Sequence, residues 1–207
     1  MKYLFILFLI FANNFYGQNV RATESLWDLI RSNSNLKYDS ERIEIIKASD
    51  KYNSNQYLIN RLSKNGQRYL YYTVKEGLRK NLPVELSLIP FVESQFDPYA
   101  RSATGASGIW QFIPSTAREN GLKKNWWYDG RRDIVASTEA AYGFLSKLYE
   151  RYGDWLIAIA AYNAGPSRIK KEIEKNKKNG LPTDFWSLNL PRDCLLYTSP
   201  SPRDLVI

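Results

Sequence analysis

The chain has 207 residues and a formal net charge of +8, from 29 Lys and Arg against 21 Asp and Glu, and this length suits one medium-sized domain with flanking segments. It has no histidine and a single cysteine, which excludes Ser–His and Cys–His nucleophile pairs, an intramolecular disulfide and a thiolate-rich metal site. Its chemistry must therefore run on carboxylates, hydroxyls, amides or backbone groups.

Residues 1–18 are predicted to be a secretory signal peptide. Lys2 precedes an apolar run over residues 4–12, which is too short to cross a membrane comfortably. The alternative is an uncleaved membrane anchor, because Phe15 breaks the small-residue pattern that precedes a cleavage site, although Gly17 fits it. We expect an exported protein of the periplasm or cell envelope, with membrane association only if the leader stays uncleaved.

The cationic surplus favours a polyanionic partner. An exported chain does not meet nucleic acid, and no nucleic-acid-binding motif accompanies the basic residues. An anionic wall polymer or a lipid surface therefore fits better, and a basic surface with no dedicated partner is the alternative. We expect no nucleic-acid partner. We also expect the protein to be a monomer.

Residues 19–81 are predicted to form a helical lead-in. Apolar residues recur there at steps of three, four and seven, as in the series Leu70, Val74 and Leu78, which is typical of amphipathic helices. Clusters rich in Asn and Ser separate the helices. The lead-in either wraps the main domain or acts as a linker, and the sequence leaves both open.

A second region begins at Pro83, because proline is favoured in the first turn of a helix. The run over residues 84–96 is strongly apolar. Pro90 lies inside it and is predicted to kink that helix by removing one ladder hydrogen bond.

Three further helices are predicted over residues 133–151, 155–161 and 167–178. Asp133 is interpreted as the N-cap of the first. The second is apolar nearly all round and is expected to be buried, whereas the third is charged and solvent-exposed. Because no segment alternates convincingly at period two, residues 82–191 are expected to form a mainly α domain.

Residues 192–207 are expected not to belong to the native protein. The helical pattern gives way there to a cluster of Ser and Pro (LLYTSPSP). The string CLLYTSPSPRD also resembles a peptide that arises when sequencing-adapter DNA is translated as coding sequence. Cys194 is then not native, and the natural chain is expected to continue with other residues.

The first segment that carries candidate chemistry is residues 89–96 (IPFVESQF), in which Glu93 has apolar and aromatic sequence neighbours. Desolvation raises the pKa of a carboxyl group, and this is how an acid is kept protonated near neutral pH. Glu93 is therefore a candidate proton donor. On these residues alone, a partly exposed glutamate at a helix end is the plainer interpretation.

The second segment is residues 105–111 (GASGIWQ). Gly105 and Gly108 allow another part of the chain or a ligand to approach the backbone closely, and Gln111 offers both a donor and an acceptor. This composition suits a sugar with acetamido groups. Taken alone, a plain turn that leads into a helix is the simpler interpretation.

The third segment is residues 160–165 (AAYNAG), at the end of the apolar helix. The phenol of Tyr162 and the amide of Asn163 need hydrogen-bond partners there. Those partners are a ligand, a catalytic carboxyl group or, most simply, neighbouring structural groups.

Together the three segments resemble, in order and approximate spacing, the motifs of the soluble-type lytic transglycosylase (SLT) domain. Glu93 with Ser94, residues 105–111 and residues 161–165 carry the resemblance. Two intervening strings, NWWYDGRRD and TDFWSL, are similar to the membrane-bound murein transglycosylase D branch of this family. The resemblance covers about residues 82–191 and is looser in the lead-in.

The resemblance implies a lysozyme-like α-helical fold that cleaves the bond between N-acetylmuramic acid (MurNAc) and N-acetylglucosamine (GlcNAc) in peptidoglycan. It implies no metal and no cofactor. It also implies that Glu93 is the single catalytic acid and base. The substrate-binding residues that it implies are Ser94, which supports Glu93, Gly105, Gly108, Ile109 and Gln111 along the glycan groove, and Tyr162 and Asn163 at the catalytic subsite.

Ordinary glycosidases use two carboxylates. The candidates for the second are Asp97, Asp129, Asp133 and Glu139. Asp97 is hard to place across a sugar ring, because Pro98 follows it and the helix is expected to end nearby. The resemblance implies no second carboxylate: the 2-acetamido oxygen of the substrate stabilises the developing cation, its C6 hydroxyl attacks C1, and a 1,6-anhydro sugar results.

Two alternatives stay open. A goose-type lysozyme-like peptidoglycan hydrolase has the same fold but needs a placed second carboxylate and a water molecule. An inactive cell-wall-binding protein would keep the groove without turnover, and the joint presence of Glu93, Ser94, Tyr162 and Asn163 argues against it.

Three tryptophans are candidates for stacking on sugar rings. They are Trp110, Trp126 and Trp127. For each of them, packing in the core is the favoured interpretation.

Overall fold

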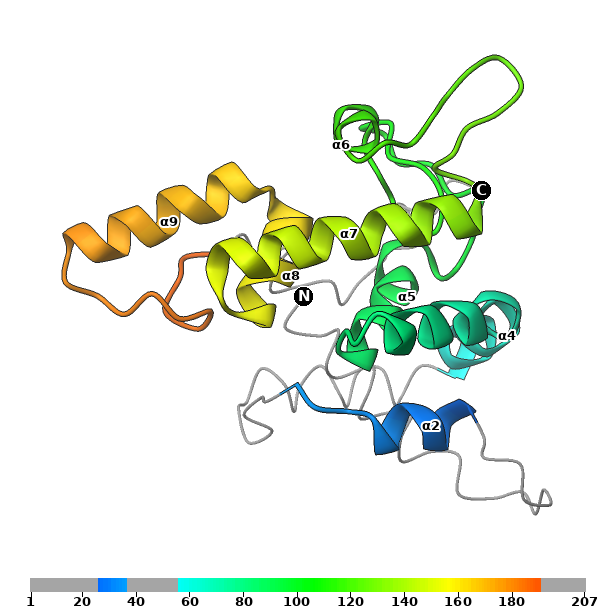
Figure 1. Cartoon of the computed structure of the whole chain (residues 1–207), viewed down its shortest axis with the longest axis horizontal. Coiled ribbons are helices and arrows are strands. Elements are labelled where there is room, and N and C mark those ends of the chain that lie inside the picture. Colours follow the sequence, from blue (N-terminus) through cyan, green and yellow to red (C-terminus); the bar gives the residue numbers. More distant parts are fainter. Residues whose placement is uncertain (1–25, 37–55, 191–207) are drawn as a thin grey trace. The chain divides into compact units, whose positions relative to one another are not determined.

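The computed structural model describes residues 26–36 and 56–190 (Figure 1). The predicted signal peptide, the middle of the predicted lead-in and the predicted non-native tail lie outside the described residues. The helices are α2 (Leu26–Ser32), α4 (Gln56–Arg79), the 3-10 helix η1 (Val84–Leu88), α5 (Ile89–Ser94), α6 (Pro114–Glu119), α7 (Ile134–Tyr152), α8 (Trp155–Ala164) and α9 (Pro166–Lys178).

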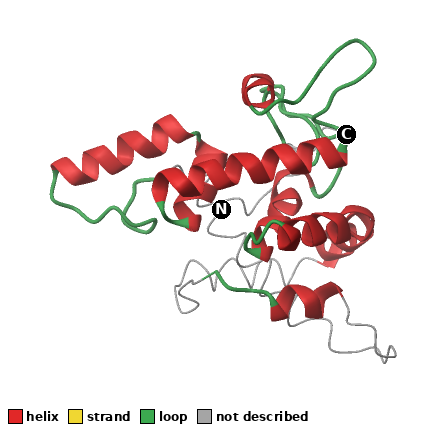
Figure 2. Ribbon diagram, viewed as in Figure 1, coloured by secondary structure: helices red, strands yellow, loops and turns green. Residues whose placement is uncertain are grey.

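The described ranges contain no strand, only three isolated β-bridges, and Figure 2 shows helices joined by loops. The prediction of a mainly α fold is confirmed. None of the helices in these ranges combines the length and the apolar character needed to cross a membrane.

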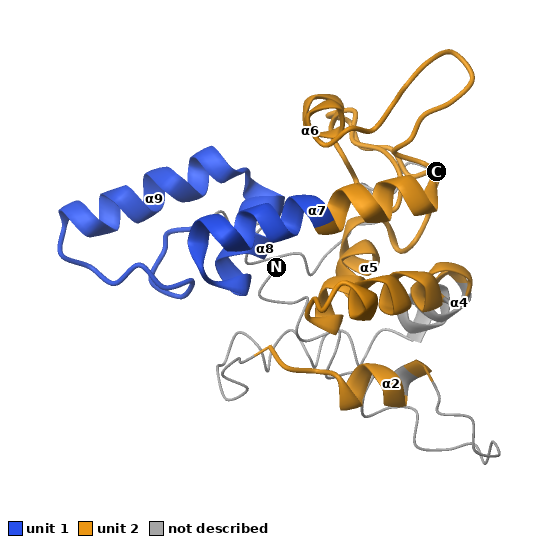
Figure 3. Cartoon of the chain, viewed as in Figure 1, with its two compact units in different colours: residues 1–3, 143–207 blue, residues 4–142 orange. Residues whose placement is uncertain are grey.

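The chain divides into two compact units, which we describe separately (Figure 3). In chain order, the first unit is described over residues 26–36 and 56–142 and is the orange unit 2 of Figure 3. The second is described over residues 143–190 and is the blue unit 1 of that figure. Helix α7 runs from one unit into the other, with Gly143 as the first residue of the second unit.

The core of the first unit forms where α4 packs against η1. Leu70 and Val74 of α4 are buried, as expected from their helical spacing, and every residue of η1 is buried as well. The hydroxyl of Tyr142, in α7, donates to the carbonyl of Thr73 at 2.6 Å. Because both Tyr142 and Thr73 are fully buried, this bond satisfies polar groups that water cannot reach.

The apolar run after Pro83 is not one kinked helix, so that prediction was wrong. The chain first forms η1 over Val84–Leu88 and then begins α5 at Ile89, with Pro90 in its first turn. A proline lacks the N–H that a helix interior needs, but in the first turn that N–H has no intrahelical partner to lose. The chain therefore starts a new helix at Ile89 instead of bending an old one at Pro90.

Glu85 connects residues 34–36, in the first described stretch of the lead-in, to the domain. Its side chain is 2% exposed, and Oε1 accepts hydrogen bonds from the hydroxyl of Ser34 at 2.7 Å and from the backbone N–H groups of Asn35 and Leu36 at 2.9 and 3.0 Å. Three hydrogen bonds from consecutive residues therefore converge on this one carboxylate oxygen. Residues 34–36 are therefore bound to η1.

The second unit contains the end of α7 and the packed pair α8 and α9. Asp154 caps α8 by accepting the backbone N–H of Ile157 at 2.9 Å, and residues 157–161 are buried. Gly153 and Gly165, with φ of 67° and 90°, end α7 and α8 at the predicted points. The predicted helices over residues 133–151, 155–161 and 167–178 are thus confirmed to within a few residues.

Candidate active site

Glu93 is the next-to-last residue of α5 and is partly exposed. The chain turns sharply after this helix, because Gln95 and Phe96 both have positive φ, 54° and 57°. The N–H of Phe96 donates to the carbonyl of Pro90 at 3.1 Å, and its fully buried ring packs edge-on against Phe91, with ring centroids 4.7 Å apart. The turn therefore anchors the end of α5 in the core and leaves Glu93 at its tip.

Ser94 ties α5 to the second motif. Its hydroxyl contacts the carbonyl of Ile109 at 3.0 Å and that of Pro90 at 3.3 Å. Two motifs that lie fifteen residues apart in the sequence are therefore joined beside Glu93. The predicted support of Glu93 by Ser94 would act through this backbone contact, and it stays a prediction.

The two glycines of the second motif have different surroundings. Both have φ of 81°, a backbone conformation that favours glycine. A Cβ at Gly108 would overlap the carbonyl oxygen of Arg131, whereas a Cβ at Gly105 would meet no atom within 4 Å. Gly108 is therefore required for close packing of two chain segments on its Cβ side, whereas Gly105 leaves that side open. The predicted place of both glycines along the groove stays a prediction.

Ile109 and Gln111 also differ in what they offer a ligand. The side chain of Ile109 is fully buried and packs in the core, and the predicted place of this residue along the groove stays a prediction. The amide nitrogen of Gln111 donates to the carbonyl of Gly108 at 2.8 Å and to that of Ala100 at 3.3 Å, which holds the turn closed. Oε1 of Gln111 has no hydrogen-bond partner among the described residues and remains an acceptor at a partly exposed position.

Arg131 fastens the second motif from the other side, and sequence reasoning missed it. Its guanidinium donates to the carbonyl of Gly105 at 2.8 Å and to that of Phe112 at 3.3 Å. It also forms two hydrogen bonds with the carboxylate of Asp129, at 2.9 and 2.6 Å. These bonds lower the pKa of Asp129 and raise that of Arg131, so both groups stay charged although Arg131 is buried.

Residues 123–130 form a tight turn that we call the tryptophan hairpin. Lys124 and Asp129 form a β-bridge across it, and the side chain of Asn125 accepts the backbone N–H groups of Trp127 and Tyr128 at 2.9 and 2.8 Å. Trp126 and Trp127 are 88% and 90% exposed. The prediction that these two rings pack in the core was wrong, because so short a turn has no layer of chain on its outer side.

The prediction for the third ring, Trp110, is confirmed. This side chain is fully buried, its Nε1 donates to the hydroxyl of Thr138 at 3.0 Å, and it packs edge-on against Tyr142, with centroids 5.3 Å apart. Trp110 therefore stabilises the core beneath the second motif.

Tyr162 and Asn163 lie in the last turn of α8, in the second unit, and both are partly exposed. The ring of Tyr162 lies 5.7 Å from that of Phe144 between centroids. Their predicted place at the end of a buried helix is confirmed, and their role at a subsite stays a prediction. Within residues 26–36 and 56–190, no group of three acidic, histidine or cysteine side chains could hold a metal ion.

The family profile described as "Transglycosylase SLT domain" matches residues 71–183, more than half of the chain. The chain belongs to the transglycosylase SLT domain family. The SLT match contains all eight predicted site residues, from Glu93 to Asn163. It also begins within α4, in the predicted lead-in.

Several SLT relatives are similar over part of their length. The chain is 41% identical over 182 residues to the membrane-bound lytic murein transglycosylase D of Escherichia coli (strain K12), with 87% of this chain and 40% of that protein covered. It is 32% identical over 127 residues to a membrane-bound lytic murein transglycosylase F of Maricaulis maris (strain MCS10), with 56% and 26% covered. A second transglycosylase F, from Desulfosudis oleivorans, is 30% identical over 108 residues, with 49% and 22% covered. The chain thus spans 40% of the transglycosylase D.

Each further carboxylate weighed as a partner for Glu93 in the SLT domain has a structural partner. Asp97 accepts a hydrogen bond from the backbone N–H of Tyr99 at 2.8 Å, and Asp129 forms an ion pair with Arg131. Asp133 accepts hydrogen bonds from the backbone N–H of Ala136 and from the phenol of Tyr128, both at 2.9 Å. Glu139 forms an ion pair with Lys80 at 2.7 Å. The interpretation of Asp133 as an N-cap is confirmed. The hydrogen bonds from Ala136, followed by that from Tyr128, lower the pKa of Asp133.

Proposed function

We propose that this chain is the catalytic part of a peptidoglycan lytic transglycosylase. The reaction is non-hydrolytic cleavage of the β-1,4 bond between MurNAc and GlcNAc, with formation of 1,6-anhydro-MurNAc ends. The observation that carries the proposal is the position of Glu93, partly exposed at the tip of α5 and joined through Ser94 to the second motif of an SLT domain. The 41% identity to a protein named lytic murein transglycosylase D supports the reaction class.

In the proposed reaction, Glu93 acts twice. As an acid it protonates the glycosidic oxygen while the C1–O bond breaks, and the 2-acetamido oxygen of the substrate stabilises the developing positive charge at C1. As a carboxylate it then takes the proton of the C6 hydroxyl while that oxygen bonds to C1. The proton that Glu93 gives in the first step is replaced in the second, so the reaction consumes no water.

The partners of the other carboxylates favour this reaction over hydrolysis. A hydrolase of this fold needs a second carboxylate to activate water or to bond to C1. The four candidates, Asp97, Asp129, Asp133 and Glu139, each form a structural hydrogen bond or ion pair. In Asp129 and in Asp133, both carboxylate oxygens accept a hydrogen bond.

The substrate contacts that we propose follow from the polar atoms that remain unoccupied. Oε1 of Gln111 is suited to accept the N–H of an acetamido group, since its amide nitrogen is already engaged. The open face of Gly105 allows a sugar to approach the backbone. We also propose that Tyr162 and Asn163 bound the catalytic subsite, and that the protein acts as a monomer on glycan strands in the periplasm or cell envelope.

The test is digestion of purified sacculi followed by mass spectrometry of the released muropeptides. The wild-type chain is expected to release products with 1,6-anhydro ends. Glu93→Gln should lower the rate by about 10³-fold or more, because the amide is isosteric but carries no transferable proton. The matched control is Glu119→Gln, an exposed glutamate at the end of α6, which should retain wild-type activity.

Two results would overturn the proposal. Products with reducing ends would identify a hydrolase, and undiminished activity of Glu93→Gln would remove Glu93 from the reaction. Circular dichroism of both variants separates loss of chemistry from loss of fold.

A further inference from the structure

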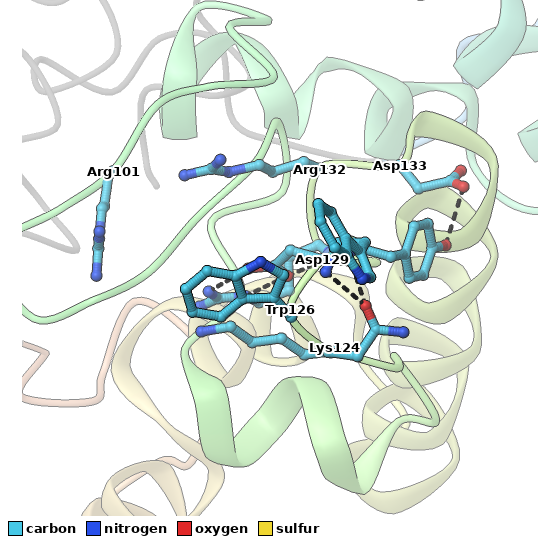
Figure 4. A pocket seen from close by; sticks show the side chains of 10 residues that line it. Arg101, Lys124, Trp126, Asp129, Arg132 and Asp133 are labelled. Carbon is cyan, nitrogen blue, oxygen red and sulfur yellow. Dashed lines mark hydrogen bonds and ion pairs between the residues drawn. The ribbon is translucent and has the colours of Figure 1, made fainter.

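The described part of the first unit contains a cavity of about 500 Å³ beside the tryptophan hairpin (Figure 4). Its walls come from Arg101, the hairpin and the residues that lead into α7, and Glu93 is not among them. A volume of this size is in the range of pockets that hold small ligands. The proposed reaction leaves this cavity without a role.

The charges that line the cavity are unbalanced. The carboxylates of Asp129 and Asp133 are occupied, the first by Arg131 and the second by the N-terminus of α7 and the phenol of Tyr128. Arg101 and Lys124 form no ion pair with any described residue, and both are exposed. The cavity therefore presents positive charge that the described part of the protein does not neutralise.

Arg132 adds a third cation to the same side. It donates from Nε to the hydroxyl of Ser107 at 3.2 Å, which leaves the outer nitrogens of its guanidinium without a described partner. In Figure 4 the ends of Arg132 and Lys124 point toward the side on which Arg101 lies, with the ring of Trp126 drawn between them. Three cationic groups thus accompany one exposed aromatic ring.

The hairpin that carries this ring is tightly built. Besides the contacts of Asn125 described above, the N–H of Gly130 donates to the carbonyl of Lys123 at 2.9 Å and that of Asn125 to the carbonyl of Tyr128 at 2.8 Å. Two large rings held in water on so constrained a turn expose apolar surface that folding alone does not require. A ligand that covers them would recover that surface.

The geometry points to a second binding site, which takes carboxylate groups borne by a wall glycan. The cations bind the carboxylates, and the flat face of Trp126 covers a sugar ring or the aliphatic part of a peptide. Two sources supply this chemistry: the lactyl carboxylate of a muramic acid without a peptide, and the carboxylates of the stem peptides. The inference rests on the proposed function for its substrate class, and it concerns binding away from the reacting bond.

An anionic membrane is the competing partner for cations beside tryptophans. A concave site lined by cations and an aromatic ring favours a discrete anionic ligand over the flat surface of a bilayer. Phosphatidylglycerol vesicles are therefore included in the test as a separate arm.

The experiment measures affinities by titration calorimetry, with the full chain carrying Glu93→Gln so that no probe is cleaved. The glycan probes are chitohexaose, which is neutral, glycan strands stripped of peptides, and glycan strands with stem peptides. Phosphatidylglycerol vesicles are titrated in the separate arm. The test variant adds Arg101→Gln and Lys124→Gln, and the matched control adds Lys171→Gln and Lys175→Gln on the exposed face of α9. A third variant, Trp126→Ala, removes the ring.

The test variant is expected to bind at least one of the charged glycan probes about tenfold more weakly, because it loses two charge contacts that solvent partly screens. Its affinity for chitohexaose should be unchanged, because this probe carries no carboxylate. The α9 control should behave as its parent. The parent's preference for charged probes should decline between low and high salt. Loss with only one of the two charged probes identifies the source of the carboxylate. Trp126→Ala should also weaken binding of that probe.

Four results would overturn the inference: a parent that does not prefer charged probes, charged and neutral probes weakened equally, no weakening of either charged probe, or loss of vesicle binding with glycan binding intact. Failure of the proposed function would look different. In that case the wild-type chain would release no anhydro products from sacculi, whatever the affinities.

Discussion

Ser94 is the residue after Glu93, and its hydroxyl donates to the carbonyl of Ile109 at 3.0 Å. Ser94→Ala removes this bond and leaves a partly buried carbonyl without its donor, which should cost about 1 kcal/mol of stability. Because Glu93 would lose its fixed position, we expect kcat on glycan strands to fall about tenfold with KM little changed.

Ser94→Thr is the control for this prediction, because it keeps the hydroxyl. It should recover most of kcat, measured with the same strands at the same temperature. If Ser94→Ala were destabilised yet kept its full kcat, the bond would be structural only and the positioning role would be lost.

Gly108 and Gly105 form a natural matched pair, since both have φ of 81°. Gly105→Ala should cost about 1–2 kcal/mol, the strain of a side chain in the left-handed region. Gly108→Ala adds an overlap with the backbone of Arg131, so its cost should be on the order of 4 kcal/mol or more. Urea denaturation of the two variants measures the difference, and equal midpoints would contradict the close packing seen here.

At the scale of elements, the helices of residues 133–178 could be predicted well because their starts and stops are local. Asp133 caps α7, and the glycines at positions 153 and 165 end α7 and α8 through their own backbone conformations. The end of α5 was harder to predict. Whether Pro90 kinks one helix or begins another depends on how η1 is buried against α4, which is a tertiary effect.

The sequence was enough to predict which residues belong to the candidate site, but not which atoms these residues contact in the folded chain. The motif order pointed to Glu93, Ser94 and Gln111, yet the closed face of Gly108 follows from Arg131, some twenty residues away, and the burial of the Ile109 side chain is also a tertiary effect. The exposure of Trp126 and Trp127 was missed for the same reason: hydropathy describes a side chain and not the layer that covers it. The adjacent Asn125, which bonds the next backbone N–H groups, was the available signal for a tight turn.

The start of α7 has a predictable pH dependence. The pKa of Asp133 is lowered from 3.8, first by the hydrogen bond from the N–H of Ala136, so its ionised form stabilises the folded state. This contribution is fully present above the ordinary pKa and is lost as the pH falls through the lower folded value. Asp133→Ala should therefore cost about 1 kcal/mol at pH 7, and the difference from the wild type should shrink below pH 3.8.

Chemical denaturation at pH 7 and at pH 3 measures this change, and Asp133→Asn serves as the control. Asparagine keeps an acceptor for the cap but has no proton to gain, so it should lose much less at pH 7. A constant difference between Asp133→Ala and the wild type across this range would show that the charge does not contribute.

At the scale of the whole molecule, the two units share one continuous helix, α7, and the boundary falls at a glycine in its interior. Gly143 is exposed, and a Cβ placed there would meet no atom within 4 Å. Gly143→Ala should therefore stabilise the helix by about 0.5–1 kcal/mol, because glycine loses more backbone freedom on folding. We expect Tm to rise by about 2 °C in a thermal scan.

Gly153→Ala, directly after the end of the same helix, is the opposite control. Gly153 follows α7 with φ of 67°, where alanine is strained, so Tm should fall. A fall in Tm for Gly143→Ala as well would mean that the helix needs flexibility where the units join.

The contrast between one buried and two solvent-facing indoles gives the protein a built-in optical probe. Trp110 is sealed in the core and should emit at short wavelength until the fold opens, whereas Trp126 and Trp127 should emit at long wavelength and be quenched by iodide. A glycan in the cavity would shield the outer pair and shift the spectrum toward the blue, while unfolding would shift it toward the red. These three indoles thus report on occupancy of the cavity and integrity of the core, against the background emission of the other three of the chain's six tryptophans.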